Sequence, residues 1–435
     1  MRVPSAQPGA RVSQTSPAPS PDDPISSGTG QRRRSGFRAL RHRAFQVYFA
    51  GMLIRGSAIW TLFVALPWYL VSAGAGAGDV GLVTALQFLP VFAIAPLGGV
   101  LGDRVNRAAV LFTTQSVSAV LAVVLMALAL NSVTALAPFA ACAFVLGILI
   151  AAELPVRQAY LTELVPPEDA SSAVSLHATA WNTTRFVGPG IAGLVIAGPG
   201  IAVTFGLVAI GATLVAASMV LLERIRPPHA PRPRVSESVL RSLIDGFRFA
   251  IAEPRIRWAL LFVTATGVFG IMSFQTLAPL FARDLLNLGP AGYGGLLAVW
   301  GLGSVVATYV VTGVARGDRR PWLIGGSIAY SLLLAVFSFS SVVAVAYALA
   351  FALGVAQIAV VQNALVTVQR AAPDAMRSRV MGVYVMVFQG SNPIGAAFAG
   401  IVAEAFDVRI AMLAGAAILG VVALAGATAL RRTTV

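Results

Sequence analysis

Four charged side chains interrupt long apolar stretches of this sequence, and they are the residues best placed to do chemistry. They are Arg55, Glu153, Arg157 and Arg185. Burial of a charge in apolar surroundings is costly, so each of them is expected to have a partner or a function. Glu153 is the only carboxylate deep inside such a stretch, which makes it the first candidate for a group that releases and regains a proton.

Glu153 and Arg157 are four residues apart, a spacing at which two side chains meet on one face of a helix. A neighbouring base favours the charged carboxylate and opposes its protonation. Two interpretations stay open: Glu153 exchanges protons, or it forms a permanent ion pair with Arg157, extended to Arg185, that only holds helices together. Arg55 and Arg185 are also suited to contact an anionic group on a ligand.

Other kinds of chemistry find no matching pattern in the sequence. His42, His177 and His229 are isolated, Cys142 is the single cysteine, and no spacing matches a metal site. No glycine-rich loop of the type that holds phosphates is found. We therefore expect no metal, no cofactor and no enzymatic activity, and ATP is not the expected source of energy.

Composition indicates the environment that must hold these charges. Apolar residues make up 57% of the 435-residue chain and charged residues 11%, against about 45–50% and about 25% in a typical soluble domain. Such an excess of apolar side chains needs a bilayer, so the chain is predicted to be an all-α membrane protein. The net charge of +14 comes from arginines at the chain ends and between apolar runs, not from a continuous basic surface, so nucleic acid is not an expected partner.

Twelve apolar runs are each about 20 residues or longer, the length that crosses a hydrocarbon core. They lie near residues 44–71, 80–101, 108–130, 136–160, 171–197, 201–222, 257–282, 291–313, 322–340, 342–370, 377–403 and 409–430. The turn between the ninth and tenth runs rests only on a small polar cluster within residues 338–342.

The arginines sort by side when both ends of the chain are placed in the cytoplasm. Segments on that side then hold 26 arginines, and the outer segments hold two, Arg283 and Arg409. This asymmetry is a positive-inside signal. Both termini are therefore predicted to be cytoplasmic, in the cell membrane of a bacterium.

A basic linker divides the chain into two groups of six runs. The predicted units are a disordered cytoplasmic tail (1–35), a six-helix bundle (36–222), a cytoplasmic linker (223–256), a second six-helix bundle (257–430) and a short tail (431–435). The linker is expected to hold an amphipathic helix on the inner membrane surface, with an ordinary solvated helix as the alternative.

The two groups of six runs show a faint internal repeat at a shift of 207 residues. The matched residues are Gly147 and Gly354, Pro166 and Pro373, Ala192 and Ala399, and Gly193 and Gly400. They fall at corresponding places, from the fourth run into the fifth and from the tenth into the eleventh. Repeated halves of six helices, with a ligand site between them, are a known design of transport proteins.

A polar turn between the second and third runs resembles the signature loop of the major facilitator superfamily. The matching residues are Gly99, Leu101, Asp103, Arg104 and Arg107. Asn106 replaces a glycine of that signature, and Asn also tolerates left-handed backbone. The resemblance implies that Asp103 joins the halves near the eleventh helix when an inner gate closes. Glu163, with Arg157 and Arg185, is a further candidate for that gate.

A second element lies in the fifth run, where Arg185 is followed by Gly188, Pro189 and Gly193. It resembles the glycine-proline element of antiporters in the same superfamily. Proline removes a backbone donor and the glycines permit close helix contact, which together allow the helix to bend. In the second half, the counterpart of the signature loop around Asp318 is degenerate, so a gate role is not expected there.

Longer stretches at residues 40–45, 86–90 and 245–249 are similar to the macrolide-efflux and enterobactin-exporter branch, the third drug:proton antiporter group. The resemblance covers about residues 36–405 and implies a major facilitator fold of twelve helices in two pseudo-symmetric six-helix bundles. It implies a secondary active transporter that exports an amphipathic small molecule (an antibiotic, siderophore or related metabolite) by alternating access. The resemblance also implies that a proton gradient drives export. The buried charges, not the resemblance, make Glu153 the candidate for coupling. An importer or facilitator of a small metabolite, and a lipid flippase, are the alternatives on this fold.

Polar and large aromatic residues inside the runs are candidates for the lining of a ligand cavity, since sites for amphipathic molecules use such mixtures. They are Trp60, Phe63, Gln87, Asn182, Gln275, Trp300, Gln357, Asn363 and Gln389, with Phe88 and Asn392 beside them. The expected partners are a small-molecule substrate and the lipid bilayer, and the chain is expected to act as a monomer.

Overall fold

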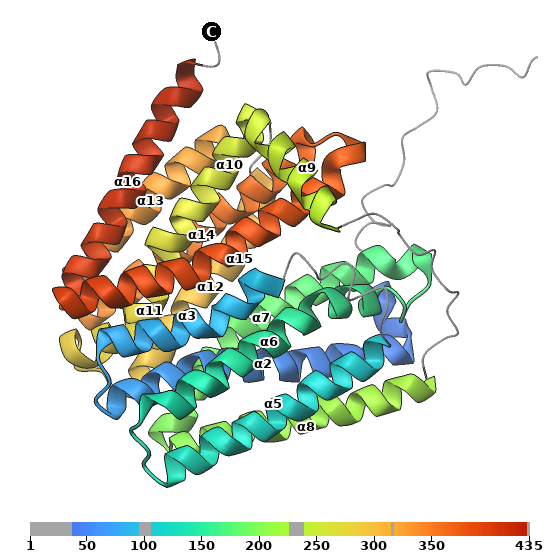
Figure 1. Cartoon of the computed structure of the whole chain (residues 1–435), viewed down its shortest axis with the longest axis vertical. Helices are drawn as coiled ribbons and strands as arrows, with labels where there is room; N and C mark the ends of the chain where they lie inside the picture. Colours follow the sequence, from blue (N-terminus) through green and yellow to red (C-terminus); the bar gives the residue numbers. More distant parts are fainter. Residues whose placement is uncertain (1–36, 95–105, 226–238, 315–316, 433–435) are drawn as a thin grey trace, which may run out of the picture.

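The computed structural model describes residues 37–94, 106–225, 239–314 and 317–432 (Figure 1). All regular secondary structure in these ranges is helical. The first half of the chain forms η1 (Arg38–Arg41), α2 (Arg43–Ser72), α3 (Ala77–Ile94), α5 (Arg107–Leu130), α6 (Leu136–Leu161), η3 (Pro167–Asp169), α7 (Ala170–Ala197) and α8 (Ile201–Ile225). The second half forms α9 (Val239–Ala252), α10 (Pro254–Ala265), η4 (Thr266–Ile271), α11 (Met272–Leu280), η5 (Phe281–Leu285), α12 (Pro290–Val314), α13 (Arg320–Ser338), α14 (Val343–Ala371), α15 (Asp374–Ala405) and α16 (Val408–Arg432).

The helices follow the predicted apolar runs closely. For the eleven runs that the structure describes completely, the observed ends lie within three residues of the predicted ones. The uncertain break is confirmed, because α13 ends at Ser338 and α14 begins at Val343. Among the described residues, ten helical stretches are long and apolar enough to cross a membrane by length and composition. The helices α3 and α7, which occupy the second and fifth predicted runs, are not among these ten, so a total of twelve spans stays a prediction.

The structure shows what Asn106 does in the signature loop. Asn106 has a φ of −67° and extended backbone, so it does not use the left-handed backbone that Asn tolerates. Its side chain instead accepts a hydrogen bond from the backbone N–H of Ala109 at 3.2 Å. Asn106 is therefore the N-cap of α5, a position for which Asn is among the preferred residues. Gly99, Asp103 and Arg104 lie outside the described residues.

The two halves form separate groups of helices that meet along two helix pairs (Figure 1). In Figure 1 the blue-to-green helices of the first half lie below the yellow-to-red helices of the second. Contacts between the halves run mainly through α3 with α15 and through α7 with α12. Because α12 and α15 hold the places in the second half that α3 and α7 hold in the first, the two contacts are equivalent. This is the pseudo-symmetry that the internal repeat predicted.

Paired glycines bring the halves together at both contacts. A Cβ added at Gly400 would lie 2.8 Å from the Cα of Gly81, and one added at Gly193 would lie 2.9 Å from the Cα of Gly294. Larger side chains would force these backbones apart. A shift of 207 residues relates Gly193 to Gly400, whereas a shift of 213 relates Gly81 to Gly294. The repeat therefore runs at 213 residues for α3 and α5 and at 207 for α6 and α7.

The packing of apolar side chains distinguishes the two ends of the bundle. We call the end at which α2 begins and α16 ends the inner end, and the opposite end the outer end, after the predicted orientation. At the outer end one cluster of buried apolar residues spans both halves. At the inner end each half has its own cluster. The described residues are therefore arranged as in an inward-facing carrier, with the halves joined at the outer end.

Polar contacts also close the outer end. The backbone N–H of Gly78 donates to Oε2 of Glu404 at 3.0 Å, and Arg283 donates to the backbone carbonyl of Val71. Each of these hydrogen bonds links one half to the other.

The linker contains the predicted helix, α9, which packs on α15. Oδ2 of Asp245 lies 3.5 Å from Nη1 of Arg379. Ile244, Phe247 and Ile251 remain more than 40% exposed. This exposed apolar face suits a membrane surface, and its placement there stays a prediction. The predicted disordered tail lies outside the described residues.

Candidate functional site

The buried charges of the first half meet at Glu153. This carboxylate, on α6, is 3% exposed. Its Oε2 accepts from Arg55 on α2, with Nη2 at 2.9 Å and Nε at 3.3 Å. Its Oε1 forms an ion pair with Arg157 one turn along α6 and accepts from Nε2 of Gln115 on α5 at 2.9 Å. We call Arg55, Gln115, Glu153 and Arg157 the charge cluster; it joins three helices.

The composition of the charge cluster corrects one prediction. The pair of Glu153 and Arg157 extends to Arg55 and not to Arg185, which lies on α7 and makes no ion pair with a described residue. Sequence reasoning missed Gln115, although a glutamine in the middle of an apolar helix is a signal for a buried partner. With two guanidinium groups on one carboxylate, the charge cluster carries one net positive charge. Hydrogen bonds from both arginines stabilise the ionised form of Glu153.

Two of the predicted gate residues meet at the inner end of the first half. Arg107, at the start of α5, forms an ion pair with Glu163, which follows α6. This pair joins two helices of the same half, so it does not itself bridge the halves. Arg157 lies in the charge cluster and Arg185 between the halves, so neither reaches Glu163.

Arg185 occupies the interface between the halves. Its Cζ lies 5.3 Å from the ring centroid of Trp60 on α2 and 4.2 Å from that of Trp300 on α12. Both distances are within the range of a cation–π contact. Trp60 belongs to the first half and Trp300 to the second. Arg185 is therefore a cation without an acidic partner among the described residues, held between aromatic rings from both halves.

The glycine-proline element explains how Arg185 reaches this position. Pro189 lies inside α7 and has no N–H to donate to the carbonyl of Arg185 one turn before it. Gly301 of α12 approaches this carbonyl so closely that an added Cβ would lie 2.6 Å from its oxygen. The carbonyl of Gly188 accepts a hydrogen bond from Oγ1 of Thr61 at 3.2 Å. The element therefore lets α7 touch α2 and α12 on either side of Arg185.

A cavity of about 40 Å³ lies beside Arg185, between the halves. Its lining consists of Trp60, Phe63, Val64, Pro67, Thr84, Gln87, Phe88, Pro189, Gln275, Leu297 and Trp300. Water takes about 30 Å³ in the liquid, so this volume suits a water molecule and the halves must separate before a larger ligand fits. Five of the nine predicted cavity residues line it, and Asn182, Gln357, Asn363 and Gln389 do not. Asn363 instead accepts from Nη1 of Arg319 at 2.9 Å.

The walls around this cavity combine aromatic surface with unused donors. Rings of Trp60, Phe63 and Phe88 follow one another at centroid distances of 5.4 and 5.7 Å. Nε1 of Trp60, Nε2 of Gln87 and Nε of Arg185 are buried without a hydrogen-bond partner in the described part of the chain. All three are donors, and unsatisfied buried donors are unfavourable. A ligand with oxygen acceptors on an aromatic body would satisfy them.

Comparisons with known proteins agree with this geometry. The sequence model of a family described as transmembrane secretion effector matches residues 34–434. The staphyloferrin A transporter of Staphylococcus aureus is 24% identical over 83% of this chain and 90% of its own length. The multidrug efflux pump Tap of Mycolicibacterium fortuitum is 27% identical over 86% of this chain and 93% of its own. The enterobactin exporter EntS of Shigella flexneri is 27% identical over 82% and 85%.

Solved structures share the fold. The nucleoside transporter NupG superposes with a TM-score of 0.67 at 15% identity, over 89% of this chain and 98% of its own. A bacterial homologue of the lysosomal transporter Spinster, in an inward-facing and unoccupied conformation, superposes with a TM-score of 0.71 at 14% identity, over 89% and 97%. The predicted fold class, an all-α membrane protein with two helical bundles, is confirmed.

Proposed function

This chain belongs to the transmembrane secretion effector family of the major facilitator superfamily, and we propose that it is a secondary active transporter that exports an amphipathic small molecule. Relatives that match more than four fifths of the chain are named for a siderophore, for enterobactin and for drugs. The proposal places the protein in the cell membrane, with both termini in the cytoplasm and a substrate that enters from the inner end.

The observation that carries the proposal is the position of Arg185. It lies between the halves, against Trp60 and Trp300, and has no acidic partner among the described residues. An unpaired guanidinium in apolar surroundings is costly, and an anionic ligand would offset that cost. We therefore infer a substrate that combines an aromatic surface with a carboxylate or a similarly acidic oxygen.

The proposal includes a proton gradient as the source of energy. Glu153 is the carboxylate of the charge cluster and would carry the proton. Protonation of Glu153 would weaken its pairs with Arg55 and Arg157, and so loosen the contact of α2 with α6. In this scheme the two interpretations of Glu153 combine, since the ion pairs hold the helices and the proton releases them.

Transport into inverted membrane vesicles tests the substrate class. The probes are a fluorescent aromatic carboxylate and its methyl ester, which differ in charge. Wild-type vesicles are expected to accumulate the acid in preference to the ester. Arg185→Gln is expected to weaken the apparent affinity for the acid about tenfold or more, the value of one charged hydrogen bond. Arg224→Gln, at the exposed end of α8, is the control that removes the same charge elsewhere.

The outcomes separate the candidate functions. Equal transport of acid and ester, unchanged by Arg185→Gln, would contradict the proposed substrate class. Accumulation only in right-side-out vesicles would instead indicate an importer. Uptake that continues without an inward-acid gradient would remove proton coupling, and full gradient-driven uptake by Glu153→Gln would remove Glu153 from it.

A further inference from the structure

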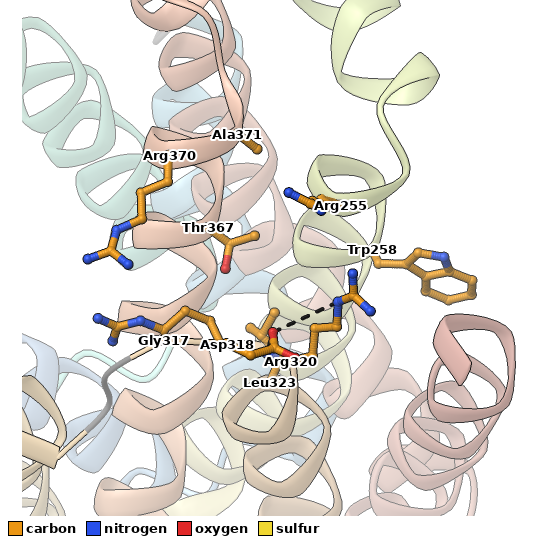
Figure 2. A pocket seen from close by; sticks show the side chains of 10 residues that line it. Arg255, Trp258, Gly317, Asp318, Arg320, Leu323, Thr367, Arg370 and Ala371 are labelled. Atoms are coloured by element: carbon orange, nitrogen blue, oxygen red, sulfur yellow. Dashed lines mark hydrogen bonds and ion pairs between the residues drawn. The ribbon is translucent and has the colours of Figure 1, made fainter. Parts of the chain in front are cut away.

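A second cavity lies at the inner end of the second half, away from the interface between the halves. Its volume is about 330 Å³, and it lies where α10, α13 and α14 end or begin (Figure 2). Its charged lining residues are Arg255, Asp318, Arg319, Arg320 and Arg370. We call this cavity the basic pocket. Four arginines against one aspartate give it a strong positive charge.

The arginines of the basic pocket are poorly neutralised. Asp318 is the single acid in the lining, and its Oδ1 is 3.9 Å from Nε of Arg320. Arg255 and Arg370 make no ion pair with a described residue. Figure 2 shows Arg255 and Arg370 on either side of Thr367, with Arg320 below them. Arg255, Arg319 and Arg370 therefore line one cavity without an ion-pair partner among the described residues.

Arg319 is the lining arginine whose charge is least favourably placed. Its Nη1 donates to Oδ1 of Asn363 at 2.9 Å, but its Nε is buried without a partner. Burial lowers the pKa of Arg319, and the positive charge of Arg370 lowers it further. The positive charges of these two lining residues thus repel each other, and an anion bound near both would relieve that repulsion.

The internal repeat allows the basic pocket to be compared with the equivalent site in the first half. The shift of 213 residues places Arg107, at the start of α5, on Arg320, at the start of α13. The shift of 207 residues places Glu163, after α6, on Arg370, near the end of α14. In the first half this pair of positions holds an ion pair. In the second half the acid is replaced by a base, so the equivalent site has two positive charges.

The surroundings of the basic pocket indicate where its anion comes from. Trp258 and the buried Leu323 add apolar surface to the lining, and tryptophan concentrates at the interface between membrane and water. The exposed apolar face of α9 (Ile244, Phe247 and Ile251) precedes α10 directly in the chain. Basic pockets between helices on the cytoplasmic side are suited to phospholipid head groups. The first turns of α10 and α13 add the positive ends of two helix dipoles.

We propose that the basic pocket binds a phosphate group, either the head group of an anionic phospholipid or free phosphate, through Arg255, Arg319, Arg320 and Arg370. Guanidinium groups bind phosphate oxygens in pairs, and four of them surround a volume that is large enough for a glycerophosphate head group. This site is separate from the transport site at Arg185, and it does not depend on the proposed substrate.

Native mass spectrometry of the full-length protein tests the proposal. Three conditions are compared: phosphatidylcholine alone, phosphatidylcholine with phosphatidylglycerol, and phosphatidylcholine with inorganic phosphate. We expect wild-type protein to retain one ligand that phosphatidylcholine does not replace. Arg319→Gln and Arg370→Gln are each expected to weaken its retention about tenfold. Arg257→Gln, which removes the same charge two residues beyond Arg255 and outside the lining, is expected to leave retention unchanged.

The variant Arg370→Glu sharpens the test, because it restores the acid that the first half has at this position. In this variant the new carboxylate is expected to pair with Arg320, so the protein should stay folded. The variant should no longer retain the phosphate-bearing ligand. Retention of phosphatidylglycerol identifies a lipid head group, and retention of inorganic phosphate with the same dependence on arginine identifies free phosphate. Retention of neither ligand, or an equal loss in Arg257→Gln and Arg370→Gln, would overturn the proposal. So would a folded Arg370→Glu variant that binds as tightly as wild type.

Discussion

Replacement of Glu153 by glutamine is predicted to destabilise the protein more than any other single change in the charge cluster. The change leaves Arg55 and Arg157 buried together without a counter-charge. Removal of one partner from a buried ion pair costs about 3–5 kcal/mol, because the remaining charge stays buried. Arg157→Gln has the opposite electrostatic effect, since it leaves Arg55 and Glu153 as a neutral pair. Its cost should be that of a lost hydrogen bond, about 1 kcal/mol.

The assay uses the single cysteine of the chain. Cys142 is 6% exposed, so a thiol-reactive dye reports unfolding when this residue becomes accessible. Unfolding in a denaturing detergent should show Glu153→Gln to be less stable than Arg157→Gln by at least about 2 kcal/mol, as the two costs imply. Asp284→Asn, at an exposed carboxylate, is the control. Equal stability of Glu153→Gln and Arg157→Gln would refute the electrostatic account of the charge cluster.

Four further substitutions test the N-cap of α5 and the packing of the helices. Asn106→Ala removes the N-cap of α5 and should lower the free energy of unfolding by about 1 kcal/mol in the same dye assay. Gly400→Val should separate the outer ends of α3 and α15. The reporter is a cysteine at position 396, where Ala396 is fully buried. It should react faster with a membrane-impermeant maleimide in the Gly400→Val protein than in protein that keeps Gly400. Gly325→Ala has open space for its methyl group and should stabilise α13 by about 0.5–1 kcal/mol, whereas Gly147→Ala would press on the backbone of Gln87 and should destabilise the fold.

The course of the helices was predictable because the bilayer imposes it. A span needs about 20 apolar residues, so the runs of the sequence already contained the helix ends to within three residues. The segments η4 and η5 are π-helical, with wider turns than an α-helix. They were not predictable, because a wider turn leaves no gap in the apolar pattern of the sequence. The contact glycines Gly81 and Gly294 were also missed, since glycine is common throughout membrane helices.

The partners of the charges were predictable only within one helix. Glu153 and Arg157 meet because four residues make about one turn, which sequence spacing reveals. The pairing of Glu153 with Arg55 depends on how α2 and α6 are rotated against each other, and spacing contains no information about that rotation. The same reason explains why the cation–π contacts of Arg185 were not foreseen, although Trp60 and Trp300 were both selected as cavity residues.

The internal repeat indicates that the charge cluster is not required for the fold. Gly56 meets Thr184 in the first half as Gly267 meets Ser391 in the second, which aligns Arg55 with Thr266. By the shift of 207 residues, Glu153 aligns with Val360 and Arg157 with Ala364. All three second-half residues are fully buried. The same scaffold is thus built once around charges and once without them.

Apolar side chains hold a buried position at least as well as an ion pair does, because they carry no desolvation cost. The second half has Thr266, Val360 and Ala364 at these positions, so uncharged side chains suit the fold, yet the first half retains Glu153 and both arginines. The proposed proton coupling gives such a cluster a role, because its charges would change state during transport. Its position next to α2 then matters, since α2 carries both Arg55 and Trp60. A proton on Glu153 would release Arg55, and α2 would transmit that release to Trp60 and Arg185 at the interface between the halves.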